Sequence, residues 1–337
     1  MARVGIVGAG SWGTALATVL DKNGHQVTLW SIVEAEIAML KEKHEQTEKL
    51  PGVILSDNIV FTCDIEETVT GMDAVILAVP SPFTRSTAKM MAPHIRQNQI
   101  IVSVAKGIEE DTLMPLSDII EEEIPAADVA VLCGPSHAEE VGRGVPTAVV
   151  AGAKTKKTAE YIQSIFMNNE FFRVYTSPDV LGMELGGALK NVIALAAGMA
   201  DGLGYGDNSK AALITRGIAE VTRLALVMGA KMETISGLTG IGDLIVTCAS
   251  KHSRNRKAGM LMGQGYTMQQ AMDEVKMVVE GVYSAKAAIG LAKKYQVSMP
   301  LIEQVNEVLF ANKPAMEAVA ELMLRDKKVE HADLEWE

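Results

Sequence analysis

The chain has few cysteines, few aromatic residues and no excess of positive charge. Its three cysteines, Cys63, Cys133 and Cys248, are widely spaced and odd in number, which argues against a disulfide framework or a zinc knuckle. The formal net charge of −11 argues against nucleic acid as a partner. An anionic ligand would therefore need a local basic pocket within an acidic protein.

Long hydrophobic runs are also missing. The longest uncharged apolar stretch, around residues 192–200, is rich in glycine and alanine and lies mid-chain, so we expect no integral membrane association. A strand signal follows Arg3 at once, which leaves no room for a signal peptide. No spacing of His, Asp and Glu is typical of a metal site. These features together predict a cytoplasmic protein without a metal.

The length of 337 residues favours two domains, and 48% hydrophobic with 22% charged residues is typical of a globular chain. Strand and helix signals alternate through the first half. Several of the strands are apolar without alternation, as in parallel sheets buried on both faces. We therefore predict an α/β fold with a doubly wound, Rossmann-type sheet. The predicted strands are 4–7, 27–30, 58–62, 74–79, 100–104, 129–133, 147–151 and 171–176.

The pattern changes at Ser177-Pro178-Asp179, and the sequence beyond it is almost wholly helical. We predict one domain over residues 1–179 and an all-α domain over 180–337, with a frayed acidic tail from Glu330. The expected helices are 34–49 in the first half, then 181–200, 209–228, 256–262, 268–274, 282–294, 299–309 and 315–324.

A glycine-rich turn joins the first predicted strand to the first helix. Gly8 permits a tight turn, Gly10 lets a pyrophosphate approach the backbone, and Gly13 lets the helix pack closely on the strand. The free N–H groups at the start of that helix would face the phosphates. This strand–turn–helix context predicts a dinucleotide site, whereas a glycine turn in an unrelated α/β protein is the alternative.

The helix over 181–200 is apolar nearly all round, which predicts burial. Lys190 shares a face with small residues such as Gly186 and Gly187, which would leave space for a ligand beside the ammonium group. We favour a site residue over the alternatives, in which Lys190 reaches the surface or pairs with Glu184.

A series of short segments carries a family resemblance. They are residues 8–17 (GAGSWGTALA), 50–52, 78–81, 105–109, 133–140 (CGPSHAEE), 184–192 (ELGGALKNV), 238–247, 253–256 (SRNR) and 279–281. In this order they resemble the bacterial NAD(P)-dependent glycerol-3-phosphate dehydrogenase family, which interconverts dihydroxyacetone phosphate and sn-glycerol 3-phosphate, a precursor of glycerophospholipids. The likeness runs from near Val4 to near Phe310.

The resemblance implies that residues 1–179 form the dinucleotide-binding domain and that residues 180–337 form the substrate and catalytic domain, which would be helical like that of 6-phosphogluconate dehydrogenase. It also implies NAD or NADP as cofactor, a small phosphorylated substrate and a homodimer. It gives Lys190 the proton exchange with the substrate oxygen, with Lys106 and Asp243 beside it. The implied substrate-binding residues are Lys106, Gly134, Ser136, Lys190, Asn191, Asp243, Thr247, Ser253, Arg254 and Asn255. The cofactor-binding residues are Gly8, Gly10, Ser11, Trp12, Gly13, Lys106, Gly134, Ser136, Ala138, Arg254, Val279 and Glu280.

Several assignments stay open at this level. No Arg or Lys follows the second strand, where many relatives carry one for an NADP phosphate, so Glu34 either accepts from a ribose hydroxyl or faces solvent. Asp243 could cap a helix, in place of its role beside the lysines or together with it. Arg254 could belong to a solvated basic loop. His137 invites a catalytic reading, but the resemblance places the proton chemistry on lysine.

Other functions remain as alternatives. A 3-hydroxyacid or 6-phosphogluconate type of dehydrogenase would share the two-domain plan, but the segment from Asp243 to Asn255 fits the glycerol phosphate family better. A nucleotide-sensing protein without catalysis would share the glycine turn. The presence of Lys106, Lys190 and Asp243 together argues against it.

Overall fold

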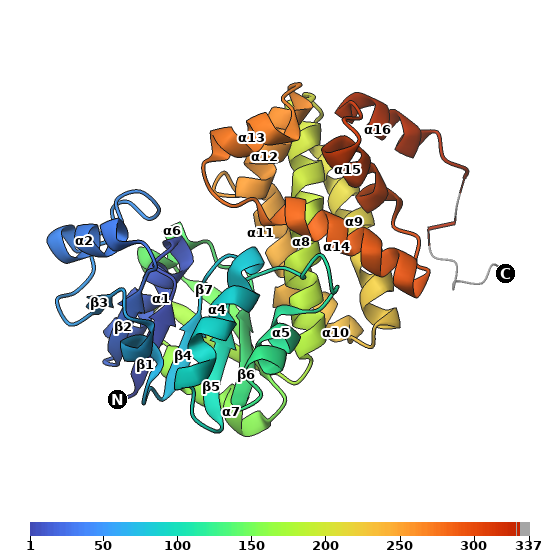
Figure 1. Cartoon of the computed structure of the whole chain (residues 1–337). Helices are drawn as coiled ribbons and strands as arrows, with labels where there is room; N and C mark the ends of the chain where they lie inside the picture. The colour runs from blue at the N-terminus through green and yellow to red at the C-terminus, as the bar shows by residue number, and fades with distance from the viewer. Residues whose placement is uncertain (328, 331–337) are drawn as a thin grey trace.

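The computed structural model describes residues 1–327, 329 and 330, so nearly all of the tail expected to fray lies outside the described residues. The chain forms an α/β half followed by an all-helical half, with the long helix α8 (Val180–Gly202) at the centre of the second (Figure 1). The expected fold class is confirmed.

One eight-stranded sheet, in the order β3-β2-β1-β4-β5-β6-β7-β8, forms the first half. Every predicted strand is present, with its ends shifted by one or two residues. The order reverses between β1 and β4, and such a switch point at the carboxyl ends of parallel strands is where dinucleotides bind. The strands are β1 (Arg3–Val7), β2 (Gln26–Trp30), β3 (Val60–Thr62), β4 (Ala74–Leu77), β5 (Gln99–Ser103), β6 (Ala127–Cys133), β7 (Thr147–Ala153) and β8 (Phe172–Ser177).

The sheet is parallel except at one place, where β7 runs antiparallel to β6. The connection between them holds only the five-residue helix α6 (Ala138–Gly142) and the turn that starts at Gly134. β7 then pairs in parallel with β8, so β7 and β8 run opposite to the other six strands of the sheet.

Helices cover both faces of the sheet. They are α1 (Ser11–Lys22), α2 (Glu34–Lys43), α3 (Ile65–Val69), α4 (Thr84–Met91), α5 (Leu116–Glu123) and α7 (Lys156–Phe166), with short 3-10 turns η1 (Ser81–Phe83) and η2 (Ala92–His94). The helix predicted over 34–49 ends early, because His44 takes the left-handed conformation with φ of 49°. The residues after it form a loop that returns to the cleft.

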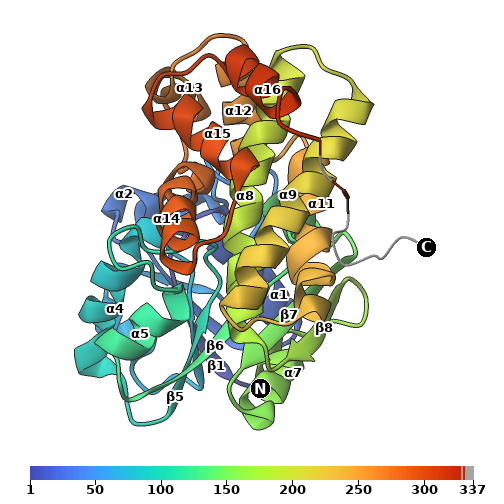
Figure 2. The same cartoon turned by 90° about the vertical axis from the view of Figure 1, so that its right-hand side faces the viewer.

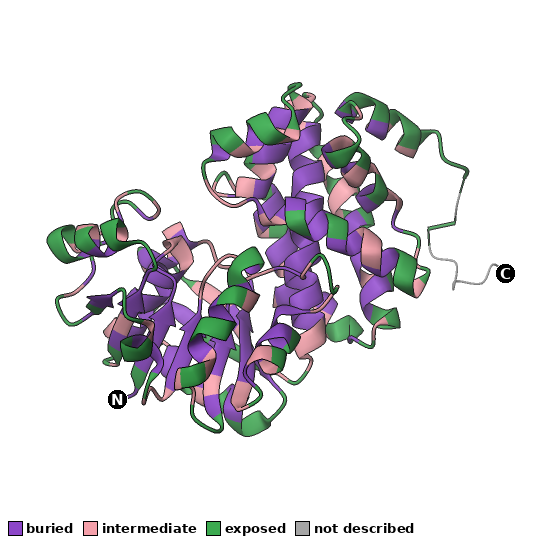
Figure 3. Ribbon diagram, in the orientation of Figure 1, coloured by how far each residue is buried: buried purple, intermediate pink, exposed green. Residues whose placement is uncertain are grey.

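The helical half packs around α8, which is buried along its length (Figures 2 and 3). By length and composition α8 could span a membrane, but 89% of its most apolar window is buried inside the protein, as in a core helix. The other helices are α9 (Asp207–Val227), α10 (Met232–Ile235), α11 (Asp243–Ala249), α12 (Arg254–Gly263), α13 (Met268–Val275), α14 (Glu280–Tyr295), α15 (Pro300–Phe310) and α16 (Ala315–Met323).

Glycines let the backbones in this half touch. A methyl group on Gly198 of α8 would collide with the carbonyl oxygen of Arg256, and one on Gly259 of α12 with that of Leu195. The small residues beside Lys190 serve the same purpose. A methyl group on Gly186 would lie 2.6 Å from the carbonyl oxygen of Thr239. The expectation that these residues leave room for a ligand is therefore wrong, since protein fills that space.

The glycine-rich segment before Asp243 is helical. Leu238–Gly242 forms one π-helical turn, η3, which runs directly into α11. A side chain on Gly240 would collide with the carbonyl oxygen of Ile235, so glycine is required for this tight return. The close packing of η3 on α8 brings Asp243 against Lys190.

Candidate active site

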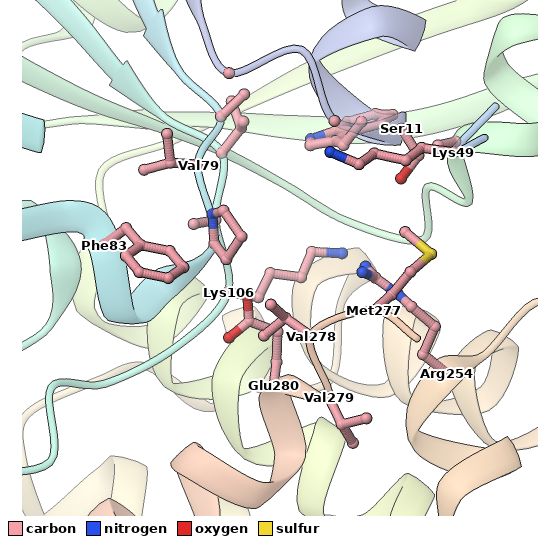
Figure 4. Close-up of a pocket in the computed structure, with 18 of the residues that line it drawn as sticks. Ser11, Lys49, Val79, Phe83, Lys106, Arg254, Met277, Val278, Val279 and Glu280 are labelled. Atoms are coloured by element: carbon pink, nitrogen blue, oxygen red, sulfur yellow. The ribbon is translucent and has the colours of Figure 1, made fainter. Parts of the chain in front are cut away.

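A cleft of about 1020 Å³ lies between the two halves. The sheet half contributes Ser11, Val79 and Lys106, and the helical half contributes Arg254 and the segment 277–280 (Figure 4). In the close-up, the ends of the Lys106 and Arg254 side chains approach each other. Two cations that face the same space favour an anionic ligand between them.

The glycine turn opens onto this cleft. Gly8 has φ of 125° and passes so close to Ala78 that a side chain would lie 2.8 Å from its carbonyl carbon. A side chain on Gly13 would collide with the carbonyl oxygen of Gly8. At Gly10 an added methyl group would meet nothing within 4 Å among the described residues. Gly10 thus leaves open space at the N-terminus of the twelve-residue helix α1, which fits a pyrophosphate.

Asp243 binds two lysines from different domains. Its Oδ1 accepts a hydrogen bond from Lys190 Nζ at 2.8 Å, and its Oδ2 accepts one from Lys106 Nζ at 2.7 Å. All three side chains are largely withdrawn from water, with exposures of 2% for Asp243, 7% for Lys190 and 18% for Lys106. Asp243 does not cap a helix, because α11 begins at Asp243 itself, its N-cap is Gly242 and no side chain makes a capping hydrogen bond there.

Burial and charge set the protonation of this cluster. Burial, together with the charge of Lys106, lowers the pKa of Lys190 to about 8 against the attraction of Asp243. Burial also opposes the charge of Lys106, but attraction to Asp243 outweighs it and raises the pKa of Lys106. Burial opposes ionisation of Asp243 too, yet both lysines hold its pKa below the usual range. Lys190 is therefore the member that can exchange a proton near neutral pH.

Lys190 has a second partner in Thr247. The Thr247 hydroxyl accepts from Lys190 Nζ at 2.5 Å and donates to the main-chain carbonyl of Asp243 at 2.6 Å. The pairing of Lys190 with Glu184 is not seen. Glu184 instead accepts from the main-chain N–H of Ser117 at 2.9 Å, at the start of α5, and thereby ties α8 to the sheet half.

Two buried amides form a network next to the cluster. Asn255 Nδ2 donates to Asn191 Oδ1 at 2.9 Å, and Asn255 Oδ1 accepts from the N–H of Gly281 at 2.8 Å. These bonds join α8, α12 and the start of α14. They fix Asn191 and Asn255 at the wall of the cleft.

Arg254 begins α12 and does not belong to a solvated basic loop. Ser253 caps this helix, with its hydroxyl accepting from the N–H of Arg256 at 3.1 Å. Arg256 turns away and donates to Asp201 at 2.6 Å. Arg254 lines the cleft and has no ion-pair partner in the described part of the chain.

The remaining predicted residues fall in two groups. Trp12, Ser136, Ala138, Val279 and Glu280 line the cleft. Gly13, Gly134 and Asp243 lie behind its surface, where the Gly134 carbonyl accepts from Lys106 Nζ at 2.9 Å. The Glu280 carboxylate accepts from the N–H of Ser81 at 3.1 Å and from its hydroxyl, which joins the two halves at the cleft.

Sequence reasoning missed several charged residues of the cleft, among them Glu36 and Lys49. Glu36 and Lys49 line it, whereas the expected Glu34 is exposed and lies outside the lining. No local motif marks Lys49, because the loop after α2 brings it back to the end of β2.

The pKa values of His137, Cys133 and Cys248 are all shifted away from neutral pH. Burial lowers the pKa of His137 to about 4, helped by the charges of Lys190 and Lys106, so the ring is neutral near pH 7. Burial raises the pKa of Cys133 to about 11 and that of Cys248 to about 12, as for inert core thiols. No group of three potential metal ligands gathers anywhere in the described residues.

The fold and the site define a two-domain, dinucleotide-dependent dehydrogenase. The glycine turn lies at the switch point of a Rossmann-type sheet, and the lysine–aspartate–lysine cluster faces that turn. Family models agree over both halves: the N-terminus of NAD-dependent glycerol-3-phosphate dehydrogenase matches residues 3–159, and its C-terminus matches residues 179–320. The chain belongs to the NAD-dependent glycerol-3-phosphate dehydrogenase family. It is an NAD(P)-dependent oxidoreductase, and neither alternative function is supported.

Individual relatives agree along the whole chain. A glycerol-3-phosphate dehydrogenase [NAD(P)+] of Agathobacter rectalis is 74% identical over 336 residues, covering 100% of both chains. That of Bacillus subtilis is 51% identical over 99% of this chain and 97% of its own. The crystal structure of glycerol-3-phosphate dehydrogenase from Coxiella burnetii superposes with a TM-score of 0.93 at 35% identity, covering 96% of this chain and 99% of that one.

Proposed function

We propose that the chain reduces dihydroxyacetone phosphate to sn-glycerol 3-phosphate with NADH or NADPH, and catalyses the reverse reaction. The observation that carries this proposal is the buried Asp243 carboxylate, which holds Lys190 and Lys106 beside the cleft onto which the glycine turn opens. The product is a precursor of glycerophospholipids.

The residues of the sheet half suit a dinucleotide. The N–H groups at the start of α1 and the open space at Gly10 receive the pyrophosphate, with Ser11 and Trp12 beside it. Gly8 and Gly13 shape the turn, and Ala138, Val279 and Glu280 line the wall where the two halves meet. When bound, the reduced nicotinamide supplies a hydride.

Lys190 moves the proton. Its pKa of about 8 keeps it mostly protonated near neutral pH, so it can donate a proton to the ketone oxygen during reduction. In the oxidative direction the neutral amine accepts the proton from the hydroxyl group. Asp243 orients this amine and offsets the charge of both lysines.

Lys106 and Arg254 recognise the charged end of the substrate. They approach each other across the cleft, and Arg254 presents a planar guanidinium fork that matches a phosphate group (Figure 4). Ser253 places Arg254 by capping α12, whereas Asn191, Thr247 and Asn255 hold the wall beside Lys190. Gly134 and Ser136 position Lys106 through the Gly134 carbonyl.

We also propose that the two domains divide at 179/180, that the protein is cytoplasmic and that it forms a homodimer. The division falls between the last strand and α8. Exposed apolar side chains on the helical half, such as Val227, Met232 and Ile245, support an interface with a second copy.

The test of the function is a reduction assay with several ketones. Dihydroxyacetone phosphate should consume NADH or NADPH and yield glycerol 3-phosphate, whereas 3-oxo acids and unphosphorylated dihydroxyacetone should be poor substrates. Equal turnover of a 3-oxo acid, or no turnover of dihydroxyacetone phosphate, would reject the proposal.

A further inference from the structure

We infer that Glu36 determines the choice between the two nicotinamide dinucleotides, by holding Lys49 and disfavouring a 2′-phosphate. This inference rests on the proposed function only in that the cleft binds such a cofactor. The observation behind it is an ion pair, Glu36 with Lys49, in the cleft wall next to the end of β2.

The position of the pair is the one that reads the adenosine ribose. In Rossmann-type folds an acidic residue after the second strand accepts hydrogen bonds from the ribose hydroxyls, and a nearby basic residue accommodates a 2′-phosphate. Here Trp30 ends β2, and Ser31, Ile32, Val33, Glu36 and Lys49 all line the cleft beyond it. Lys49 lies on the same side of the cleft as Ser11 of the glycine turn (Figure 4).

Glu36 is held in place by its neighbours. The buried Ser31 hydroxyl donates to Glu36 Oε2 at 2.7 Å, and Glu36 Oε1 accepts from Lys49 Nζ. Only 13% of the Glu36 side chain is exposed, against 33% for Lys49. The carboxylate is therefore a fixed acceptor at the wall rather than a solvated surface charge.

Lys49 is tied to the glycine turn. The buried Gln46 side chain donates through Nε2 to the carbonyl of Ala9 at 3.0 Å, and its Oε1 accepts from the N–H of Lys49 at 3.4 Å. The loop that carries Lys49 thus keeps its place relative to the turn at which the pyrophosphate would bind.

The pair has opposite consequences for the two cofactors. A ribose 2′-hydroxyl can donate to the Glu36 carboxylate while Lys49 stays bound. A 2′-phosphate carries negative charge, meets Glu36 at close range, and gains Lys49 only if the ion pair breaks. Residues 31–34 include no Lys or Arg that could bind the 2′-phosphate in place of Lys49. The side chain exposed at that rim is Ile32, which is 68% exposed and apolar. The arrangement favours NADH.

The test is the affinity of the protein for each nucleotide, measured by fluorescence titration without substrate. The wild-type protein should bind NADH more tightly than NADPH. Glu36→Gln keeps an acceptor for Ser31 and releases Lys49, so its affinity for NADPH should rise about tenfold or more while that for NADH changes little. The double variant Glu36→Gln/Lys49→Met should lose this gain, which separates Lys49 from other cations of the cleft such as Lys276.

Glu34→Gln is the matched control, since Glu34 is exposed and outside the cleft lining. It should leave the ratio of the two dissociation constants unchanged. An unchanged ratio in Glu36→Gln, an equal shift in Glu34→Gln, or a wild-type preference for NADPH would overturn the inference. If neither nucleotide binds the wild-type protein, the proposed function fails as well; if both bind and the ratio does not respond, only this inference fails.

Discussion

The Lys190 ammonium lies 2.8 Å from Asp243 Oδ1, and the other oxygen of the same carboxylate binds Lys106 from the opposite half of the molecule. One buried anion therefore balances two cations. An isolated buried charge is costly, and removing one partner of a buried pair leaves the other uncompensated. The cluster holds one net positive charge beside the cleft, which suits a phosphorylated ketone in an otherwise acidic protein.

The pH dependence of the reaction should report Lys190. Its pKa is lowered to about 8 by burial and by Lys106, so the protonated form needed for reduction is lost as the pH rises through that value. The kcat/KM for dihydroxyacetone phosphate should fall above about pH 8, by about tenfold per pH unit at the limit. The kcat/KM for glycerol 3-phosphate should rise over the same range. A reduction rate that is flat or rising there would contradict the proton-donor role.

Gly10→Val should abolish cofactor binding without unfolding the protein. An added side chain at Gly10 meets no protein atom within 4 Å in the described structure, but it enters the space left for the pyrophosphate. Fluorescence titration with NADH and a thermal melt on the same sample measure both effects. Gly13→Val is the contrasting variant, because its side chain collides with the Gly8 carbonyl and should destabilise the fold. Unchanged NADH affinity in Gly10→Val would mean that the turn is only structural.

Arg254→Ala should weaken recognition of the phosphate group. Removing one side of a charged, bidentate interaction in a closed site costs roughly 2–5 kcal/mol, so KM for dihydroxyacetone phosphate should rise at least about tenfold. Unphosphorylated dihydroxyacetone, a poor substrate, should be affected far less. Arg256→Ala serves as a control, because Arg256 pairs with Asp201 and does not line the cleft. If Arg254→Ala loses activity equally on both ketones, Arg254 belongs to the cofactor site or to the scaffold.

The glycine turn, the eight strands and most helices could be predicted from the sequence because each depends on a local pattern. The end of α2 at Lys43 rather than Lys49 could not be predicted, because a left-handed residue, His44, decides it. The antiparallel direction of β7 has no local signal in the sequence either. Lys190 was recognisable from its apolar helix, although the glycines beside it pack against protein. The hydrogen bond between Lys106 and Asp243 spans 137 residues and could be expected only through the family resemblance.

Residues whose chemistry depends on a distant loop were harder to find. Glu34 is the first acidic residue after β2, yet Glu36, and not Glu34, lines the cleft beyond the turn at Ser31–Val33. Lys49 reaches the same wall through the tie between Gln46 and Ala9. The spacing of residues along the chain therefore does not predict that Lys49 lies at this wall.

The most direct test of the account is a comparison of the Lys190→Ala variant with the wild-type protein, using dihydroxyacetone phosphate and saturating NADH. A positioned general acid contributes roughly 10²–10⁴-fold, so the variant should lose turnover by that order while its NADH titration stays near wild type. Lys293→Ala, at an exposed lysine outside the cleft, should behave as wild type. Near-normal kcat in Lys190→Ala would contradict the central claim that the lysine held by Asp243 exchanges the proton with the substrate.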